Sequence, residues 1–355
     1  MVLLILECEQ KEKMVDSHIR RRTVFSKLIR GRSSLLGITI IAIVVLAGTF
    51  APVIAPMSPY TQVLEFRNQK PGFTGEIILF RLTPELPVQT VAVASISKKG
   101  ETIQYQDQLN RVFKIEKNKL EGVKEKDWHK KYRYWLGTDN FGRDVLSRLL
   151  YGARISLLVG ISASTLSLLI GVILGAISGY YGGVLETLIM RLTDIMFGFP
   201  TLLFLIGITA AFEPTLTVVF FAIGFVSWPG MARLMRGQVA SIKESEFIKV
   251  CEVLGLSKPR ILLKHILPNC FAPMIVTYTL GIAGAIMVEA SLSFLGLGAQ
   301  PPTPSWGIMI NAGKDFIRTA PWLSIIPGIA IASTVIGFNL MGDSLRDVLD
   351  PSMKK

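Results

Sequence analysis

Three cysteines, three histidines and few charged residues set the first limits on this 355-residue sequence. Cys8, Cys251 and Cys270 cannot form a disulfide framework, so a small secreted fold held by disulfides is excluded. Charged residues make up 18% of the chain and hydrophobic residues 50%, whereas an average globular protein has about 25% charged residues. A pair of soluble domains is therefore a poor fit, and long apolar segments are indicated.

Two patterns that carry chemistry are also missing. The sequence has no G-x-x-x-x-G-K-[ST] phosphate loop, so any nucleotide chemistry must reside in another subunit. His18, His129 and His265 lie in three unrelated segments, which argues against a metal site within this chain. Only His265 lies near an apolar run, at its end, and an intramembrane protease is therefore not favoured.

Apolar runs long enough to cross a bilayer are abundant. A spanning helix needs about 20 mostly apolar residues. We expect six spans, at residues 35–56, 154–181, 187–212, 214–234, 270–295 and 319–342. Arg191 and Asp194 lie three residues apart in the third span, and this spacing predicts that they pair on one helix face.

The distribution of Lys and Arg predicts the orientation of these spans. Residues 1–34 form a basic tail, and residues 233–265 hold seven Lys or Arg against three Glu. Because short cytoplasmic segments are enriched in Lys and Arg, both termini are expected in the cytoplasm. The net charge of +12 then reflects cytoplasmic loops and contact with anionic membrane lipid, and not binding of nucleic acid.

Residues 57–135 are the one candidate for a water-exposed domain. They contain short tracts rich in Val and Ile, with Lys98 to Gly100 where a hairpin turn would fall, and a Lys-rich stretch at 114–131. The strand-like tracts are residues 76–82, 88–97, 101–105 and 111–116. The predicted fold class is an all-α polytopic membrane protein with a small β-rich extracytoplasmic insertion between helices 1 and 2.

The segment 241–269 is polar overall yet spaced for two short amphipathic helices. Ser241 and Glu244 fit a capping box, Gly255 supplies a stop, and Pro268 is expected to end the second helix. The first helix is expected to present one apolar face made of Phe247, Ile248, Cys251 and Leu254. This face either packs on the ends of the protein's own helices or docks in the groove of a partner protein.

At this segment the sequence resembles a known family. Residues 246–269, EFIKVCEVLGLSKPRILLKHILPN, are similar to the EAA loop of ABC importer permeases, which forms the coupling helices that contact the ATPase subunits. The Glu, the Gly nine residues later and the Ile-Leu-Pro ending match. The two alanines do not match, because Val250 and Cys251 stand near their positions.

Further motifs resemble the C-type subunit of the dipeptide, oligopeptide and nickel permeases. They follow one another in the family's order and cover about 220 residues from Trp135 onward. The motifs are LGTDNFGRDVLSR at 136–148, YGARISL at 151–157, EASLSFLGLG at 289–298, PPTPSWG at 301–307 and NLMGDSLRDVLDP at 339–351.

The resemblance implies a type I ABC importer permease with a core at residues 136–350, set in a bacterial or archaeal cytoplasmic membrane. Its partners would be a second homologous permease subunit, two ATP-binding subunits and an extracytoplasmic substrate-binding protein. This chain would bind no cofactor, and ATP with Mg would be held by the partners. The residues expected to couple to the ATPase are Glu246, Phe247, Ile248, Cys251, Leu254, Gly255, Leu256, Ile266 and Pro268.

Candidates for the gate or the substrate path lie near the predicted outer side. A charge in a span is a functional candidate because of its desolvation cost, and Glu289 either meets substrate or anchors the following loop. The resemblance adds Ser291, Phe294, Arg143 and Asp144, the last two of which also fit a polar cap before a helix. The Pro-rich loop 296–318 is expected to form a short re-entrant segment or a surface scoop, with Trp306 and Trp322 as membrane-interface anchors.

The predicted function is ATP-driven import of dipeptides or oligopeptides through alternating access. A nickel or other small-solute importer of the same family is the alternative. A secondary transporter or channel is a more distant one, since six spans alone would allow it and no inverted repeat is evident.

Overall fold

The computed structural model describes residues 31–349 except residues 84, 100, 108, 123 and 214. Most of the predicted basic tail, residues 1–34, and the last residue of the predicted core, residue 350, therefore lie outside the described residues. The described chain divides into two compact units. One holds residues 31–44, 158–289 and 332–349, and the other holds residues 45–157 and 290–331.

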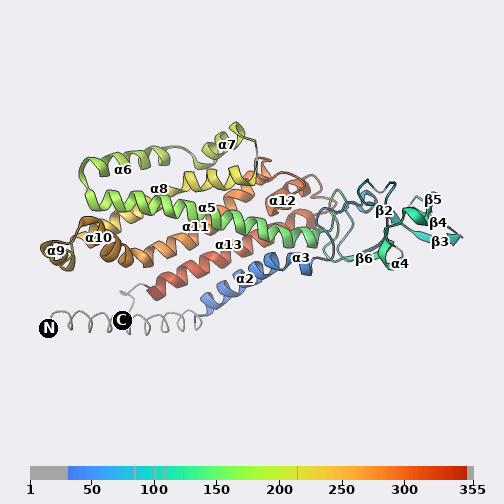
Figure 1. Ribbon diagram of the computed structural model, residues 1–355, viewed down its shortest axis with the longest axis horizontal. Coiled ribbons are helices and arrows are strands. Elements are labelled where there is room, and N and C mark those ends of the chain that lie inside the picture. The colour runs from blue at the N-terminus through green and yellow to red at the C-terminus, as the bar shows by residue number, and fades with distance from the viewer. Residues whose placement is uncertain are drawn as a thin grey trace. The chain divides into compact units, whose positions relative to one another are not determined.

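Most of the described chain is helical (Figure 1). Among the described residues, five helical segments are long and apolar enough to cross a membrane, or up to six if one bent pair is a single span. The five are α2 (Arg32–Thr49), α5 (Val145–Tyr181), α8 (Leu216–Lys243), the run Lys258–Phe294 that ends in α11 (Phe271–Phe294), and α13 (Trp322–Leu349). Short helices α3 (Ala51–Ile54) and α12 (Trp306–Lys314) accompany them.

The third predicted span is not one continuous helix. Residues 187–212 fall in α6 (Gly183–Gly198) and α7 (Thr201–Ala211), which are bent by 88°. Phe199 is extended, with ψ of 134°, and Pro200 follows it. The residue before a proline disfavours the helical conformation, so the Phe199-Pro200 pair explains the break between α6 and α7.

Glycines bring α5 and α8 into close contact in the first unit. A Cβ added at Gly171 would lie 2.5 Å from Met231 Cβ, and one at Gly179 would lie 2.6 Å from the Arg236 carbonyl oxygen. A Cβ at Gly175, between them, would collide with the Ala232 carbonyl. The three glycines follow the small-xxx-small pattern, which lets the backbones of two helices approach closely. Such close packing matters in a membrane, because the hydrophobic effect does not drive helices together in lipid.

The described residues of the second unit form six strands in two antiparallel sheets, ordered β2-β1-β6 and β3-β4-β5. β3 and β4 form a hairpin in which Lys99 pairs with Thr102. The strands are β1 (Phe73–Phe80), β2 (Gln89–Val93), β3 (Ser95–Lys99), β4 (Thr102–Gln106), β5 (Val112–Glu116) and β6 (His129–Tyr134), with η1 (Leu64–Phe66), η2 (Lys117–Lys119) and α4 (Glu125–Trp128) between them.

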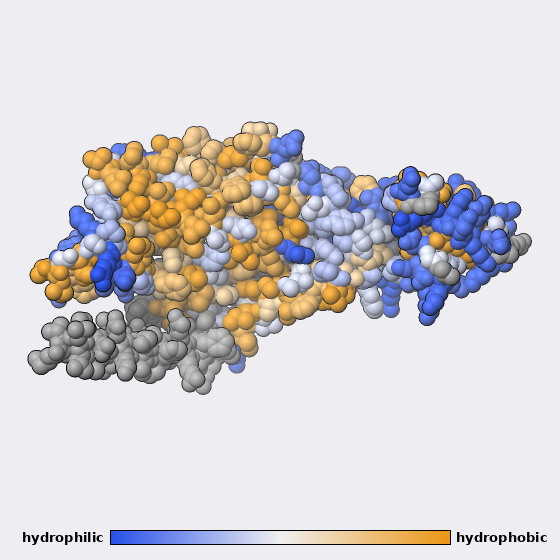
Figure 2. Space-filling model, in the orientation of Figure 1, coloured by the Kyte–Doolittle hydropathy of each residue, from blue (hydrophilic) through white to orange (hydrophobic). Residues whose placement is uncertain are grey.

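The two sheets share a small core. Ile78 of β1 and Ile103 of β4 are fully buried, and they belong to one cluster with Tyr105 and Trp128. Hydrophilic residues dominate the visible surface of the strands, whereas hydrophobic residues dominate that of the helices (Figure 2). This contrast is what a water-exposed sheet domain and lipid-exposed helices require.

Strand β6 was not among the predicted strands. It pairs with β1 in the register Phe73↔Tyr134, so its partner lies more than 50 residues earlier in the chain. Its sequence, HKKYRY, is too basic to carry an apolar strand pattern. Pairing with a distant strand therefore decides its conformation.

Candidate functional site

The segment after α8 forms two short helices joined by a glycine. α9 (Glu246–Val253) and α10 (Lys258–Ile261) flank Gly255, which has a φ of +74°. The glycine elbow matches the predicted pattern, and α10 follows Ser257 with Pro259 in its first turn. The predicted capping box is wrong, because α8 continues to Lys243 and Ser241 lies inside it.

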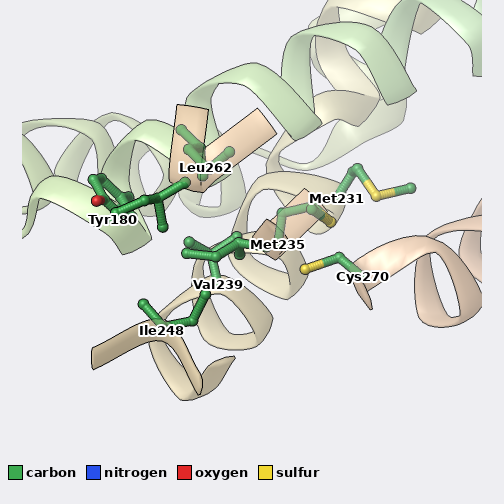
Figure 3. Close-up of a cluster of buried hydrophobic side chains, with 10 residues drawn as sticks. Tyr180, Met231, Met235, Val239, Ile248, Leu262 and Cys270 are labelled. Carbon is green, nitrogen blue, oxygen red and sulfur yellow. The ribbon is translucent and has the colours of Figure 1, made fainter. Parts of the chain in front are cut away.

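One face of this segment is anchored in the first unit. Ile248 of α9 and Ile261, Ile266 and Cys270 after the elbow are fully buried. They form one cluster with Tyr180 of α5 and with Met231, Met235 and Val239 of α8 (Figure 3). Cys251 and Leu256 are partly buried against the same cluster. The cluster therefore ties α9 to the ends of α5, α8 and the segment leading into α11.

The opposite face of α9 is apolar and exposed. Val253 is 88% exposed, Leu254 74%, Val250 57% and Phe247 47%. The prediction of one shared face is therefore wrong: Ile248 and Cys251 face inward, whereas Phe247 and Leu254 face outward. We call Phe247, Val250, Val253 and Leu254 the α9 ridge. Glu246, in the first turn beside it, is exposed and carries the negative charge that suits a helix N-terminus.

Pro268 does not end a helix. The chain passes from α10 through η3 (Leu262–Ile266), a π turn, and η4 (Leu267–Cys270), a 3-10 turn, directly into α11. Proline removes one i→i−4 hydrogen bond, and a π turn followed by a 3-10 turn replaces that pattern locally. The helical run that begins with α10 at Lys258 therefore continues without interruption into α11.

The predicted gate residues of α11 lie in different environments. Glu289 is fully buried, Ser291 is half-buried and Phe294 is 39% exposed. The Lys314 ammonium of α12 lies 5.6 Å from the centroid of the Phe294 ring, and Asn311 Nδ2 donates to the Phe294 carbonyl at 2.6 Å. Phe294 therefore belongs to the packing between the end of α11 and α12.

Arg143 and Asp144 belong to a buried polar turn at the start of α5. The Asp139 carboxylate accepts from Arg143 Nε at 2.6 Å, and Arg148 Nε lies 3.5 Å from the same oxygen. Asp144 accepts from the Ser147 backbone N–H at 2.7 Å and so caps α5. Burial raises the pKa of the Asp144 carboxyl, against the hydrogen bonds from Ser147 that lower it. These contacts give Arg143 and Asp144 a structural task, and a gating task for them stays a prediction.

Two other sequence predictions are corrected by the packing. Asp194 pairs with Arg233 of α8 at 2.7 Å, and not with Arg191, while the Arg233 guanidinium also lies 4.5 Å from the Phe197 ring centroid. Trp306 is 2% exposed and donates its indole N–H to the Leu149 carbonyl at 3.0 Å, so it is a core residue and not an interface anchor. In both cases a residue from another helix offers the better partner.

Sequence reasoning missed a cavity of about 130 Å³ between α5, α8 and α11, which has a mainly apolar lining with several hydroxyl groups. Its hydroxyl-bearing lining includes Ser164, Ser167, Ser227 and Tyr278. Serines and threonines inside apolar runs were the available signal. Among the described residues no group of three or more His, Cys, Asp or Glu is placed to hold a metal ion.

The long apolar helices and the anchored segment after α8 define a polytopic membrane protein. Residues 171–355 match the family of binding-protein-dependent transport system inner membrane components. Residues 20–71 match the N-terminal TM domain of oligopeptide transport permease C. The chain belongs to the binding-protein-dependent transport system inner membrane component family, as the sequence motifs predicted. It is a multi-pass inner-membrane permease, and not itself the ATPase of an ABC transporter.

Two relatives found by sequence agree with this assignment. The dipeptide transport system permease protein DppC of Alkalihalophilus pseudofirmus is 49% identical over 221 residues, covering 62% of this chain and 73% of that protein. The oligopeptide transport system permease protein OppC of Haemophilus influenzae is 44% identical, covering 61% and 70%. A structure of the MetNI methionine ABC transporter in an inward-facing conformation is 15% identical, with a TM-score of 0.49 over 57% of this chain and 97% of that chain.

Proposed function

We propose that this chain is a permease subunit of an ATP-driven, binding-protein-dependent importer of dipeptides or oligopeptides. Its relatives are named as dipeptide and oligopeptide permeases, and the sequence has no phosphate loop of its own. A second permease subunit, two ATPase subunits that hold ATP and Mg, and an extracytoplasmic binding protein complete the transporter. Both termini lie in the cytoplasm, where α9 meets the ATPase.

The observation that carries this proposal is the α9 ridge, which is exposed while Ile248, on the other side of the same short helix, is fully buried. Exposed apolar residues on an amphipathic helix suit a groove on a partner. Because Ile248 sits in the cluster with α5 and α8, a displacement of the ridge by the ATPase is passed to both helices. The predicted coupling set therefore divides into an anchor (Ile248, Cys251, Leu256, Ile266) and a contact surface (Phe247 and Leu254, beside Glu246).

The contact surface is tested by replacing Leu254 with aspartate. Leu254 is 74% exposed, so Leu254→Asp should leave the chain's abundance in the membrane unchanged. An aspartate buried in an apolar groove costs about 2 kcal/mol or more, so ATP-driven uptake should fall at least about tenfold. Uptake and the co-purified ATPase subunits are measured together.

Leu254→Met is the matched control, since it keeps an apolar side chain of similar volume and should transport normally. An intact complex with normal uptake in Leu254→Asp would contradict the assignment of the α9 ridge to the ATPase. Charge reversal at Glu246 should weaken the same association by a smaller factor.

The strand-containing segment is proposed to lie outside the cytoplasm and to contact the binding protein or the second permease. The two family matches cover residues 20–71 and 171–355, and all the strands lie between these regions. Phe73 pairs directly with Tyr134, so a short Gly/Ser bridge can replace residues 75–132 without moving the flanking chain. The deletion should reduce delivery from the binding protein more than it reduces the ATPase activity of the solubilised complex.

Uptake at increasing concentrations of binding protein measures this delivery. The proposal predicts a higher concentration for half-maximal uptake in the deletion variant. Unchanged binding-protein dependence, or cleavage of the strands by a protease added to the cytoplasmic side, would overturn it.

A further inference from the structure

The cavity between α5, α8 and α11 has an uncharged, mainly apolar lining that carries several hydroxyl groups. Ser164 and Ser167 come from α5, Ser227 from α8, and Thr277, Tyr278 and Gly281 from α11, and the remaining lining residues are apolar. The cavity of about 130 Å³ lies within the first unit, where these three helices run beside one another (Figure 1). No charged side chain lines it.

One hydroxyl in this cavity is buried without a partner. Ser164 is 6% exposed, and its Oγ has no hydrogen-bond partner among the described residues. A serine or threonine inside a helix can donate its hydroxyl to the carbonyl four residues earlier, as Thr165 does to Ile161 at 2.7 Å. A buried polar atom left unpaired lowers stability, and such an atom in a native protein calls for an explanation. A bound polar group in the cavity supplies that explanation.

The lining selects for neutral groups that both donate and accept. A serine or tyrosine hydroxyl rotates to offer either a proton or a lone pair. Tyr278 OH lies 3.0 Å from Thr165 Oγ1 and keeps further hydrogen-bonding capacity. An ionised group would lose its hydration without meeting an opposite charge, whereas a main-chain amide offers one N–H and one C=O that match the hydroxyls.

We propose that this cavity binds a main-chain amide of the peptide in transit. The inference rests on the proposed function and adds to it a subsite with a stated chemistry. Hydrogen bonds between these hydroxyls and the peptide main chain do not involve the peptide side chains. The subsite therefore accepts peptides of different sequence and disfavours their charged termini.

Filling the cavity tests the inference in the complete transporter, reconstituted in vesicles with ATP, its binding protein and trialanine. An added Cβ at Gly281 would lie 3.7 Å from Ser164 Oγ, so Gly281→Val fits the fold and places methyl groups against that hydroxyl. Gly284, three residues on in α11, has no atom within 4 Å of an added Cβ and does not line the cavity. Gly281→Val should reduce uptake about tenfold, and Gly284→Val should leave it near the wild-type rate.

Peptide chemistry tests the same subsite without adding bulk. Trialanine is compared with its analogue N-methylated at the first of its two peptide bonds, which lacks one N–H donor. The same binding protein serves every variant, so a change in the ratio of the two uptake rates belongs to this chain. Ser164→Ala should lower the wild-type preference for the unmethylated peptide about fivefold, the worth of one hydrogen bond.

The outcomes separate the subsite from the proposed function. Normal uptake in Gly281→Val, an equal loss in Gly281→Val and Gly284→Val, or an unchanged ratio in Ser164→Ala would overturn the subsite, and the cavity would then hold water alone. Absence of ATP-dependent trialanine uptake by the wild-type complex would instead refute the proposed function. A selective loss in Gly281→Val together with the altered ratio supports both.

Discussion

Replacing Gly255 with valine should reduce ATP-driven uptake to the ATP-independent background while the chain still inserts into the membrane. Gly255 has a φ of +74°, a region that β-branched residues essentially do not occupy. Valine would force the elbow into another conformation, which draws Ile248 out of its buried cluster and displaces the α9 ridge. Uptake in vesicles and chain abundance in the membrane measure the two effects separately.

Gly255→Asn distinguishes backbone conformation from side-chain bulk at the elbow. No atom lies within 4 Å of a Cβ added at Gly255, so a side chain has room there. Asparagine tolerates the left-handed region and is the usual substitute for glycine after a helix. Near-normal uptake in Gly255→Asn is therefore expected. Equal loss in both variants, or normal uptake in Gly255→Val, would show that the elbow is not conformationally required.

Replacing Asp139 with alanine should destabilise the second unit by about 3–5 kcal/mol, the usual cost of removing one partner from a buried ion pair. The Arg143 and Arg148 side chains are 5% and 2% exposed, and both approach the Asp139 carboxylate. Asp139 also accepts from the backbone N–H groups of Phe141 and Arg143, each at 2.9 Å. Without it, two buried guanidinium groups lose their counter-ion, and the yield and thermal midpoint of the solubilised protein should fall sharply.

Asp144→Asn provides the matched control for this turn. Asn caps a helix about as well as Asp, so the hydrogen bond from the Ser147 N–H can be kept. The change should cost less than about 1 kcal/mol. If Asp139→Ala melted at the same temperature as Asp144→Asn, the buried ion pairs would not stabilise the start of α5.

The spanning helices could be located from the sequence because hydrocarbon selects long uncharged runs locally. α11 at Phe271–Phe294 lies close to the predicted 270–295. The break between α6 and α7 also has a local cause, Phe199 followed by Pro200. The prediction overlooked it because the apolar run continues through both residues. The glycine stripe at 171, 175 and 179 was readable as well, whereas the helix against which it packs was not.

The coupling segment shows how far a sequence pattern reaches. The positive φ at Gly255 depends on a few neighbouring residues, and the sequence predicted a helix stop there. The division of α9 into a buried and an exposed apolar face depends on α5 and α8, because Ile248 and Phe247 are equally apolar and adjacent. Helical periodicity groups residues into faces, but it does not say which face the rest of the protein covers.

By itself the sequence determined the family, the apolar spans and the glycine elbow, because each depends on composition or on motifs within a short stretch of chain. Only the tertiary structure decided the pairing of β6 with β1, the pairing of Asp194 with Arg233, and the cavity around Ser164. These features depend on residues that are distant in the sequence and that meet only after the chain has folded. Such contacts depend on the entropy of loop closure and on which other residues compete for the same partner. A local sequence pattern therefore does not predict them.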